Sequence, residues 1–228
     1  MRLDEIVGYV QNIATYRRDY WAMQSLLGGF EMTLCGELAY LLNGEELKAW
    51  QSIDNRRIWR SEYKRMKSPR IDIARIVNED GRKNSFRIDE AIEIKVAHLC
   101  YGSKLSERIN NVGRYLIKHM EEDIEKYKWQ EGERTNLFCV GVLLETVRES
   151  SVSIDHRMLN SGVRYGWLNN EMESWNAEKY PEITKNIKKV ITKKEERRWY
   201  VYSPACLGNM FGWQVRWHII GVHNEVRL

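Results

Sequence analysis

Two stretches of the chain alternate between apolar and polar residues with the period of two that is typical of a β-strand. The first stretch covers Pro69–Val77 and the second covers Ala91–Ala97. Between them, residues 78–85 are rich in Asn, Asp, Gly and Ser, which favour tight turns. The sequence therefore predicts two strands that return antiparallel to one another.

Apolar residues spaced three and four apart predict helices elsewhere in the chain. We expect an amphipathic helix from Leu3 towards Trp21, a helix over Phe30–Asn43, a long helix over Lys104–Tyr127 and a helix beginning at Pro181. Further strands are predicted at Ile58–Lys64, Leu137–Leu144, Arg198–Ser203 and Trp213–Ile219. The last two strands should form a hairpin around a turn that contains Pro204 and Gly208, whereas Glu145–Asn170 reads as an irregular excursion.

This order of elements predicts an α/β fold in which helices flank a central mixed sheet. With 228 residues and 43% hydrophobic content, the chain suits one domain. We divide it into an N-terminal helical extension (1–28), a core (30–144) and a segment with an insertion, a helix and the last strands (145–228). No secretory signal begins the sequence, and its longest apolar run is too short to cross a membrane, so we expect a soluble cytoplasmic protein.

Acidic residues lie within the two alternating strands. Glu93 and Lys95 are two residues apart, so they should share one face of a strand while Ile92 and Ile94 face the core. An antiparallel return would bring Asp72 beside Glu93, and two adjacent carboxylates repel each other unless a cation neutralises them. We therefore expect a Mg²⁺ or Mn²⁺ site, with Lys95 orienting water or stabilising a phosphate. The alternative is an exposed ladder in which Lys95 pairs with Asp72.

The element order and three residues, Asp72, Glu93 and Lys95, resemble the PD-(D/E)xK nuclease superfamily, which has the restriction-endonuclease-like fold. Pro69 stands three positions before Asp72, where an adjacent Pro-Asp pair is common in the family. In that superfamily a helix precedes a core of three strands, a helix and a fourth strand. The resemblance implies a metal-dependent endonuclease acting on DNA. Its metal would be held by Asp72, Glu93 and the carbonyl of Ile94.

The preceding helix often supplies a further acid in this superfamily. We assign that role to Glu37, which lies three residues after Leu34 and four before Leu41, on the same face as the predicted apolar stripe of Leu34, Leu38 and Leu41. Glu31 also fits the stripe, so the choice between the two acids stays open. Either acid could instead border the packed face without binding metal.

Basic residues gather upstream of Asp72, although the net charge is only +4. Those we expect to contact phosphates are Arg56, Arg57, Arg60, Lys64, Lys67, Arg70 and, beyond the third strand, Lys104. A second basic tract occupies residues 185–198, and nine tryptophans could stack on unpaired bases or fill the core. A homodimer would allow both strands of a duplex to be cut. A noncatalytic nucleic-acid-binding protein and a structural or assembly protein are the alternatives.

The cysteines and histidines are dispersed along the sequence. The four cysteines form no Cys-x-x-Cys pair, so we expect buried thiols in preference to zinc ligands or disulfides. His98 follows the third predicted strand closely enough to approach Lys95, but a hydrogen-bonded structural histidine is the simpler interpretation.

Overall fold

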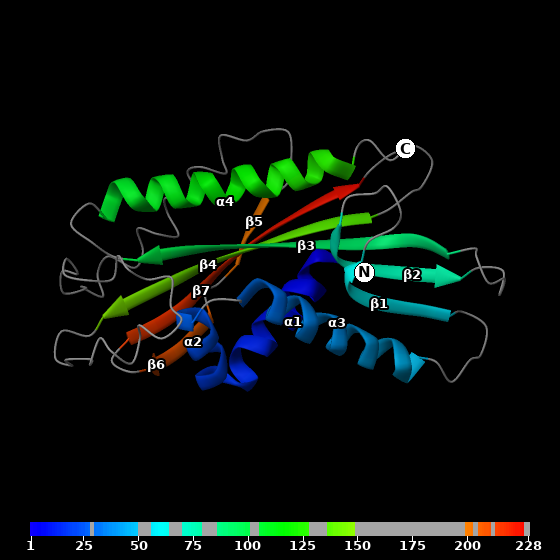
Figure 1. The fold of residues 1–228 in the computed structure, drawn as a ribbon, viewed down its shortest axis with the longest axis horizontal. Coiled ribbons are helices and arrows are strands. Elements are labelled where there is room, and N and C mark those ends of the chain that lie inside the picture. Colours follow the sequence, from blue (N-terminus) through cyan, green and yellow to red (C-terminus); the bar gives the residue numbers. More distant parts are fainter. Residues whose placement is uncertain are drawn as a thin grey trace.

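A mixed β-sheet separates two layers of helices in this protein (Figure 1). The computed structural model describes residues 1–27, 30–49, 56–63, 70–78, 86–100, 105–127, 136–148, 199–202, 205–210 and 213–225. The helices are α1 (Leu3–Tyr16), α2 (Arg18–Leu27), α3 (Phe30–Ala49) and α4 (Leu105–Tyr127). The strands are β1 (Arg56–Tyr63), β2 (Ile71–Asn78), β3 (Phe86–Cys100), β4 (Asn136–Arg148), β5 (Trp199–Val201), β6 (Ala205–Met210) and β7 (Trp213–Glu225).

The sheet runs in the order β1-β2-β3-β4-β7, with β5 and β6 both paired to the outer side of β7. Neighbouring strands are antiparallel except β3 and β4, which are parallel. Parallel strands need a crossover connection, and α4 supplies it on the face opposite α1, α2 and α3 (Figure 1). The expected α/β fold with a mixed sheet flanked by helices is thereby confirmed.

Each face of the sheet carries its own buried cluster. On the side of α1–α3, the apolar stripe predicted for the N-terminal helix is buried against strand residues such as Ile92 and Ile94. On the side of α4, the alanines of β3 pack beneath Leu116, Met120 and Ile124. Because both faces are covered, the central strands have little room for charge, and any ionised side chain there needs a specific partner.

Several tryptophans serve the core. Trp21 and Trp217 are almost fully buried and meet each other and Phe30 edge to face, with ring centroids 4.8–5.6 Å apart. The indole N–H of Trp217 donates to the Ser25 hydroxyl at 3.0 Å. Trp59 is also buried. These three rings are therefore not available to stack on bases.

Helix α3 is anchored on the edge strand β1 by Asn43. Its side-chain amide donates to the carbonyl of Trp59 and its oxygen accepts from the N–H of the same residue, both at 2.8 Å. The asparagine thus takes the place of a neighbouring strand, which protects part of the sheet edge. It also fixes how α3 lies across β1, β2 and β3.

Some predicted boundaries were wrong. The fourth strand continues to Arg148 instead of ending at Leu144, because residues 145–148 complete the ladder with β7. Gly208 lies inside β6, where the register shifts, so it marks an irregularity in the strand and not a turn. The N-terminal helix is divided into α1 and α2. The predicted helix at Pro181 and the rest of residues 149–198 lie outside the described residues.

Helix α4 approaches β4 most closely at Gly141. A Cβ at this position would lie 2.6 Å from the sulfur of Met120 and 3.2 Å from Cδ2 of Leu116. We expect Gly141→Ala to destabilise the protein by about 1–3 kcal/mol, because both neighbours are buried and must shift. Chemical denaturation measures the change.

Gly8→Ala is the matched control for this substitution. Gly8 lies within α1. Apart from its neighbours in the chain and the backbone of its own helix, no atom of the described residues would come within 4 Å of the new Cβ, so the change should stabilise the protein by roughly 0.5–1 kcal/mol. Equal effects at both positions would contradict the close approach of α4 to β4.

Candidate active site where β2 leaves β3

Strands β2 and β3 separate beside the predicted acids. The last paired residues are Ile73 and Ile92, whereas β3 stays paired with β4 as far as Cys100. Beyond this fork, the carboxylate oxygen Oδ2 of Asp72 accepts a hydrogen bond of 2.8 Å from the backbone N–H of Ile94. The side chain of Asp72 therefore replaces a missing strand partner. Asp72 directly precedes Ile73 and Glu93 directly follows Ile92, so the two acids flank the last pair of the ladder.

Glu93 and Lys95 share one face of β3, also as predicted, but that face is not open. It is the face covered by α4, and the side chain of Glu93 is only 3% exposed. Lys95 remains 23% exposed. The alternative of an exposed ladder does not describe this arrangement, since Lys95 makes its closest ion pair with α4.

The ammonium of Lys95 lies among three carboxylates. Its Nζ is 2.9 Å from Oδ2 of Asp123, 3.9 Å from Oε1 of Glu31 and 4.0 Å from Oε2 of Glu93. Burial by itself would lower the pKa of Lys95, but the hydrogen bond and charge of Asp123, with the charges of Asp72 and Glu31, raise it above its ordinary value. Lys95 is therefore a cation at neutral pH and not a proton acceptor.

Sequence reasoning missed Asp123, although a signal for it exists. Asp123 follows Met120 by three residues and precedes Ile124, so it falls on the apolar stripe of α4. Its side chain is 1% exposed. An acid on a buried helical stripe requires a cationic partner, and that requirement could have been matched to Lys95.

The helix-borne acid that reaches this group is Glu31, not Glu37. Burial raises the pKa of Glu31 above its ordinary value of 4.5, with Asp72 and Asp123 adding to the rise and the charge of Lys95 and the amide of Val96 opposing it. The Val96 N–H donates to the Glu31 carboxylate. Glu31 therefore contacts β3 at Val96, two residues after Ile94, to which Asp72 binds.

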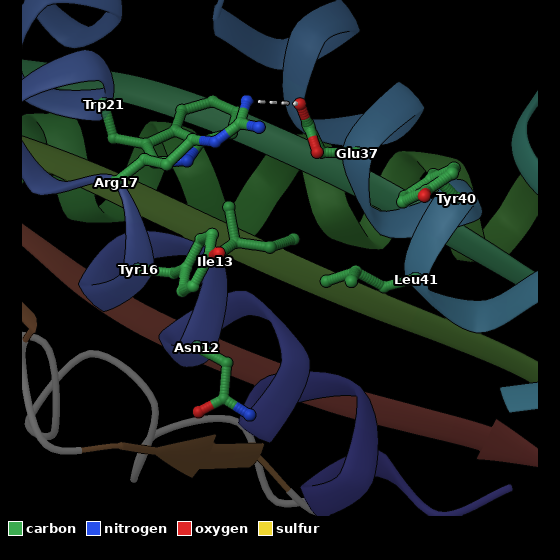
Figure 2. A pocket seen from close by; sticks show the side chains of 8 residues that line it. All are labelled: Asn12, Ile13, Tyr16, Arg17, Trp21, Glu37, Tyr40 and Leu41. Atoms are coloured by element: carbon green, nitrogen blue, oxygen red, sulfur yellow. Dashed lines mark ion pairs between the residues drawn. The ribbon is translucent and has the colours of Figure 1, made fainter. Parts of the chain in front are cut away.

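Glu37 instead lines a separate pocket between α1, α2 and α3 (Figure 2). One of its oxygens lies 3.6 Å from Nη1 of Arg17, and the pocket has a volume of about 280 Å³. The prediction erred because α3 buries Phe30, Cys35 and Leu42 with Leu34 and Leu38, while Leu41 is only half-buried. This turns the packed face towards Glu31 and away from Glu37.

Two thiols border the acidic group. Burial raises the pKa of Cys35, and the negative charges of Asp72, Glu31 and Glu93 raise it further. Burial and the charges of Glu93 and Asp123 likewise raise the pKa of Cys139. Both cysteines are free and protonated at neutral pH, as expected for buried thiols, and neither is suited to act as a nucleophile.

His98 does not join the group. It lies three residues after Lys95 on β3, so its side chain points to the opposite face of the strand. Burial lowers the pKa of His98, which keeps the imidazole neutral near pH 7.

The basic residues are only partly described. Arg60 is exposed on β1, and Arg57 is half-buried on the same strand. Arg70, two residues before Asp72, is 55% exposed and forms an ion pair with Glu62. Arg56 lies in β1, but its side chain is outside the description, as are Lys64, Lys67 and Lys104.

Only a few protein groups at this site could bind a metal ion. Within the described ranges, no three or more His, Cys, Asp and Glu side chains are arranged to hold an ion. The carboxylates of Asp72 and Glu93 are two oxygen donors. A third is the carbonyl of Ile94, because the N–H and C=O of one strand residue point to the same side and the Ile94 N–H points to Asp72. Mg²⁺ suits so small a set, since it retains several waters.

In comparisons with known proteins, no family model, no curated protein and no solved structure matches this chain. None of the described helices is both long and apolar enough to span a membrane. The chemistry of the site must therefore be argued from its own residues.

We expect Glu31→Gln to stabilise the protein at pH 7. The pKa of Glu31 is raised in the folded state, so folding opposes ionisation of this carboxyl, and the neutral amide avoids that cost. The gain should fade as pH falls through the raised pKa of the folded state towards 4.5, and it should vanish below 4.5, where the carboxyl becomes protonated in both states. Thermal unfolding of both proteins across this pH range measures the effect.

Glu37→Gln is the control, because Glu37 lies on the same helix in a half-exposed ion pair. Its effect should stay within about 0.5 kcal/mol. A gain for Glu31→Gln that does not depend on pH would contradict the electrostatic explanation.

Proposed function

We propose that this chain is a Mg²⁺-dependent nuclease of PD-(D/E)xK type that hydrolyses phosphodiester bonds, with DNA as its substrate. The observation that carries the proposal is the fork between β2 and β3, where Asp72 binds the Ile94 amide beside Glu93 and Lys95. The order α3-β1-β2-β3-α4-β4 agrees with the order of elements that the family resemblance implies. It supports a restriction-endonuclease-like core.

In this proposal Asp72, Glu93 and the carbonyl of Ile94 hold the metal ion. A bound Mg²⁺ or Mn²⁺ would lower the pKa of a coordinated water and neutralise charge on the scissile phosphate. Lys95, kept cationic by its carboxylate neighbours, stabilises negative charge that develops on the phosphate or orients the water. Glu31 takes the role that the sequence assigns to Glu37, because it approaches Lys95 and β3 while Glu37 does not.

The proposed substrate follows from the charge around the site. Arg60 and Arg70 are exposed near the start of β2, and both can contact phosphates without reading bases. Such contacts draw the backbone of a nucleic acid towards an acidic metal site that would otherwise repel it. A homodimer in which two sites cut the two strands is part of the proposal.

A noncatalytic nucleic-acid-binding protein is the second candidate. The observation that favours it is the absence, among the described residues, of a metal group with three or more acidic, His or Cys ligands. Cleavage of circular, linear and single-stranded DNA, and of RNA, in Mg²⁺, Mn²⁺ or EDTA separates the two functions. Salt-sensitive binding without cleavage would support the second candidate, and neither activity would favour a structural or assembly protein.

We expect Asp72→Asn and Glu93→Gln each to abolish Mg²⁺-dependent cleavage while the protein still binds DNA. The asparagine of the first variant retains an oxygen that can accept from the Ile94 amide, so the fork should survive although a charged metal ligand is removed. Cleavage assays and calorimetric titration with Mg²⁺ or Mn²⁺ measure the two effects. Glu37→Gln should cut at the wild-type rate, and cleavage by both site variants would exclude this metal site.

The basic tract should act by binding phosphates. Replacing Arg60, Lys64 and Lys67 by alanine should weaken binding to all DNA sequences alike, because phosphate binding carries no sequence information. The slope of log affinity against log salt should become shallower by about one for each phosphate that is no longer neutralised. Binding at several salt concentrations measures the slope, and an unchanged slope would mean that the tract is only a solvated surface.

A further inference from the structure

Asp123 is a buried charge that packing alone does not explain. It is 1% exposed on the face of α4 that otherwise buries Leu116, Met120 and Ile124 in the core. Transferring a carboxylate into such surroundings is costly unless cations compensate for the loss of water. An apolar residue would pack on β3 and β4 without this cost, so the carboxylate needs another reason to be there.

We propose that Asp123 is a positioning residue that holds the ammonium of Lys95 beside Glu93, an inference that rests on the proposed nuclease function. The distance from Nζ to Oδ2 of Asp123 is 2.9 Å, about 1 Å shorter than the distance to either other carboxylate. A lysine side chain is long and has many rotamers, so an unanchored ammonium would sample many positions. Asp123 restricts it to one.

This arrangement leaves the ammonium with donors for the reaction. A protonated lysine has three N–H groups, and the ion pair with Oδ2 of Asp123 can engage only one of them at a time. Glu31 and Glu93 lie 3.9 and 4.0 Å from Nζ, beyond direct hydrogen-bond distance. A water molecule or a phosphate oxygen that enters beside Glu93 can therefore receive a hydrogen bond from Lys95 without displacing Asp123.

Asp123 is itself held from the other side. Its second oxygen, Oδ1, contacts the ammonium of Lys126, which is 51% exposed on the following turn of α4. The carboxylate thus bridges an interior lysine and a surface lysine, one to each oxygen. Lys126 offsets part of the charge of Asp123 and fixes its rotamer, while Lys95 remains the partner that faces the proposed metal ligands.

A purely structural role of Asp123 would have different consequences from a positioning role. In that case the Lys95–Asp123 pair would serve only to attach α4 to β3, and any loss of cleavage in an Asp123 variant would follow from lower stability. A positioning role instead makes the effect of Asp123 depend on the presence of Lys95, and a double-mutant cycle measures this dependence.

The first test compares Asp123→Asn with wild type and then repeats the comparison in a Lys95→Ala background. We expect Asp123→Asn to lower kcat by on the order of 10²-fold with little change in KM, because a displaced catalytic group costs about this much. In the Lys95→Ala background the same substitution should have almost no further effect. Equal loss in both backgrounds would overturn the proposal.

The matched control is Glu122→Gln on the same helix. Glu122 is 48% exposed and pairs with Lys118 at 3.5 Å, so the substitution changes one carboxylate of α4 without touching Lys95. It should leave kcat unchanged. Asp123→Glu, which keeps the charge but moves it by one methylene, should recover part of the activity; if Asp123→Asn does not fold, Asp123→Glu takes its place in the double-mutant cycle.

A second measurement does not depend on cleavage. Nuclear magnetic resonance of ¹³C-labelled lysine side chains should show that the terminal methylene of Lys95 is rigid in wild type and mobile in Asp123→Asn. Equal mobility in the two proteins would overturn the positioning role even in an active enzyme. A rigid Lys95 that is released by the substitution, in a protein that cuts no substrate, would overturn the proposed function while the ion pair itself stands.

Discussion

The backbone of β3 beyond Ile92 needs hydrogen-bond partners, and this need organises the candidate site. On one side β3 remains paired with β4, but on the other side its pairing with β2 has ended, so within the described strands the outward amides of Ile94 and Val96 face no neighbour. Asp72 and Glu31 accept from these two amides. Buried amides must be satisfied, and satisfying them with carboxylates brings two negative charges to the fork. The acidic character of the site thus follows from how the sheet divides.

These charges lie between two packed layers of helices, so removing each of them from water costs free energy on folding. Asp72, Glu31, Glu93 and Asp123 all lie around the same lysine, and in the described part of the chain the ammonium groups beside them are those of Lys95 and Lys126. Four carboxylates thus face two ammonium groups. Burial raises the pKa of Glu31 and of both bordering thiols, and the negative charges raise these pKa values further. The same negative charges favour the binding of a further cation. The free-energy cost of this arrangement is the kind that functional sites carry and ordinary cores avoid.

Much of this arrangement could be predicted from local sequence patterns. Period-two alternation identified β2 and β3, and the turn residues between them implied the antiparallel return that brings Asp72 and Glu93 to the same end of the ladder. The choice of helix acid failed because the predicted stripe included Leu41 and omitted Phe30 and Cys35. A helix turns by about 100° per residue, so this difference rotates the expected packed face away from Glu31 and towards Glu37. Asp123 could not be assigned from spacing alone, since its partner lies 28 residues away and meets it only when α4 crosses over the sheet.

The ammonium of Lys95 and a divalent ion need not compete for the same place. The ammonium is drawn towards α4, where Asp123 lies 2.9 Å from it, and it stays 4.0 Å from Glu93. In the proposed function, the oxygens of Glu93, Asp72 and the Ile94 carbonyl would then remain available to hold the ion. If Asp123 were absent, the nearest carboxylates to Lys95 would be Glu31 and Glu93. The lysine could then pair with Glu93, which is a proposed metal ligand, so the contact with Asp123 on α4 keeps the ammonium apart from that carboxylate.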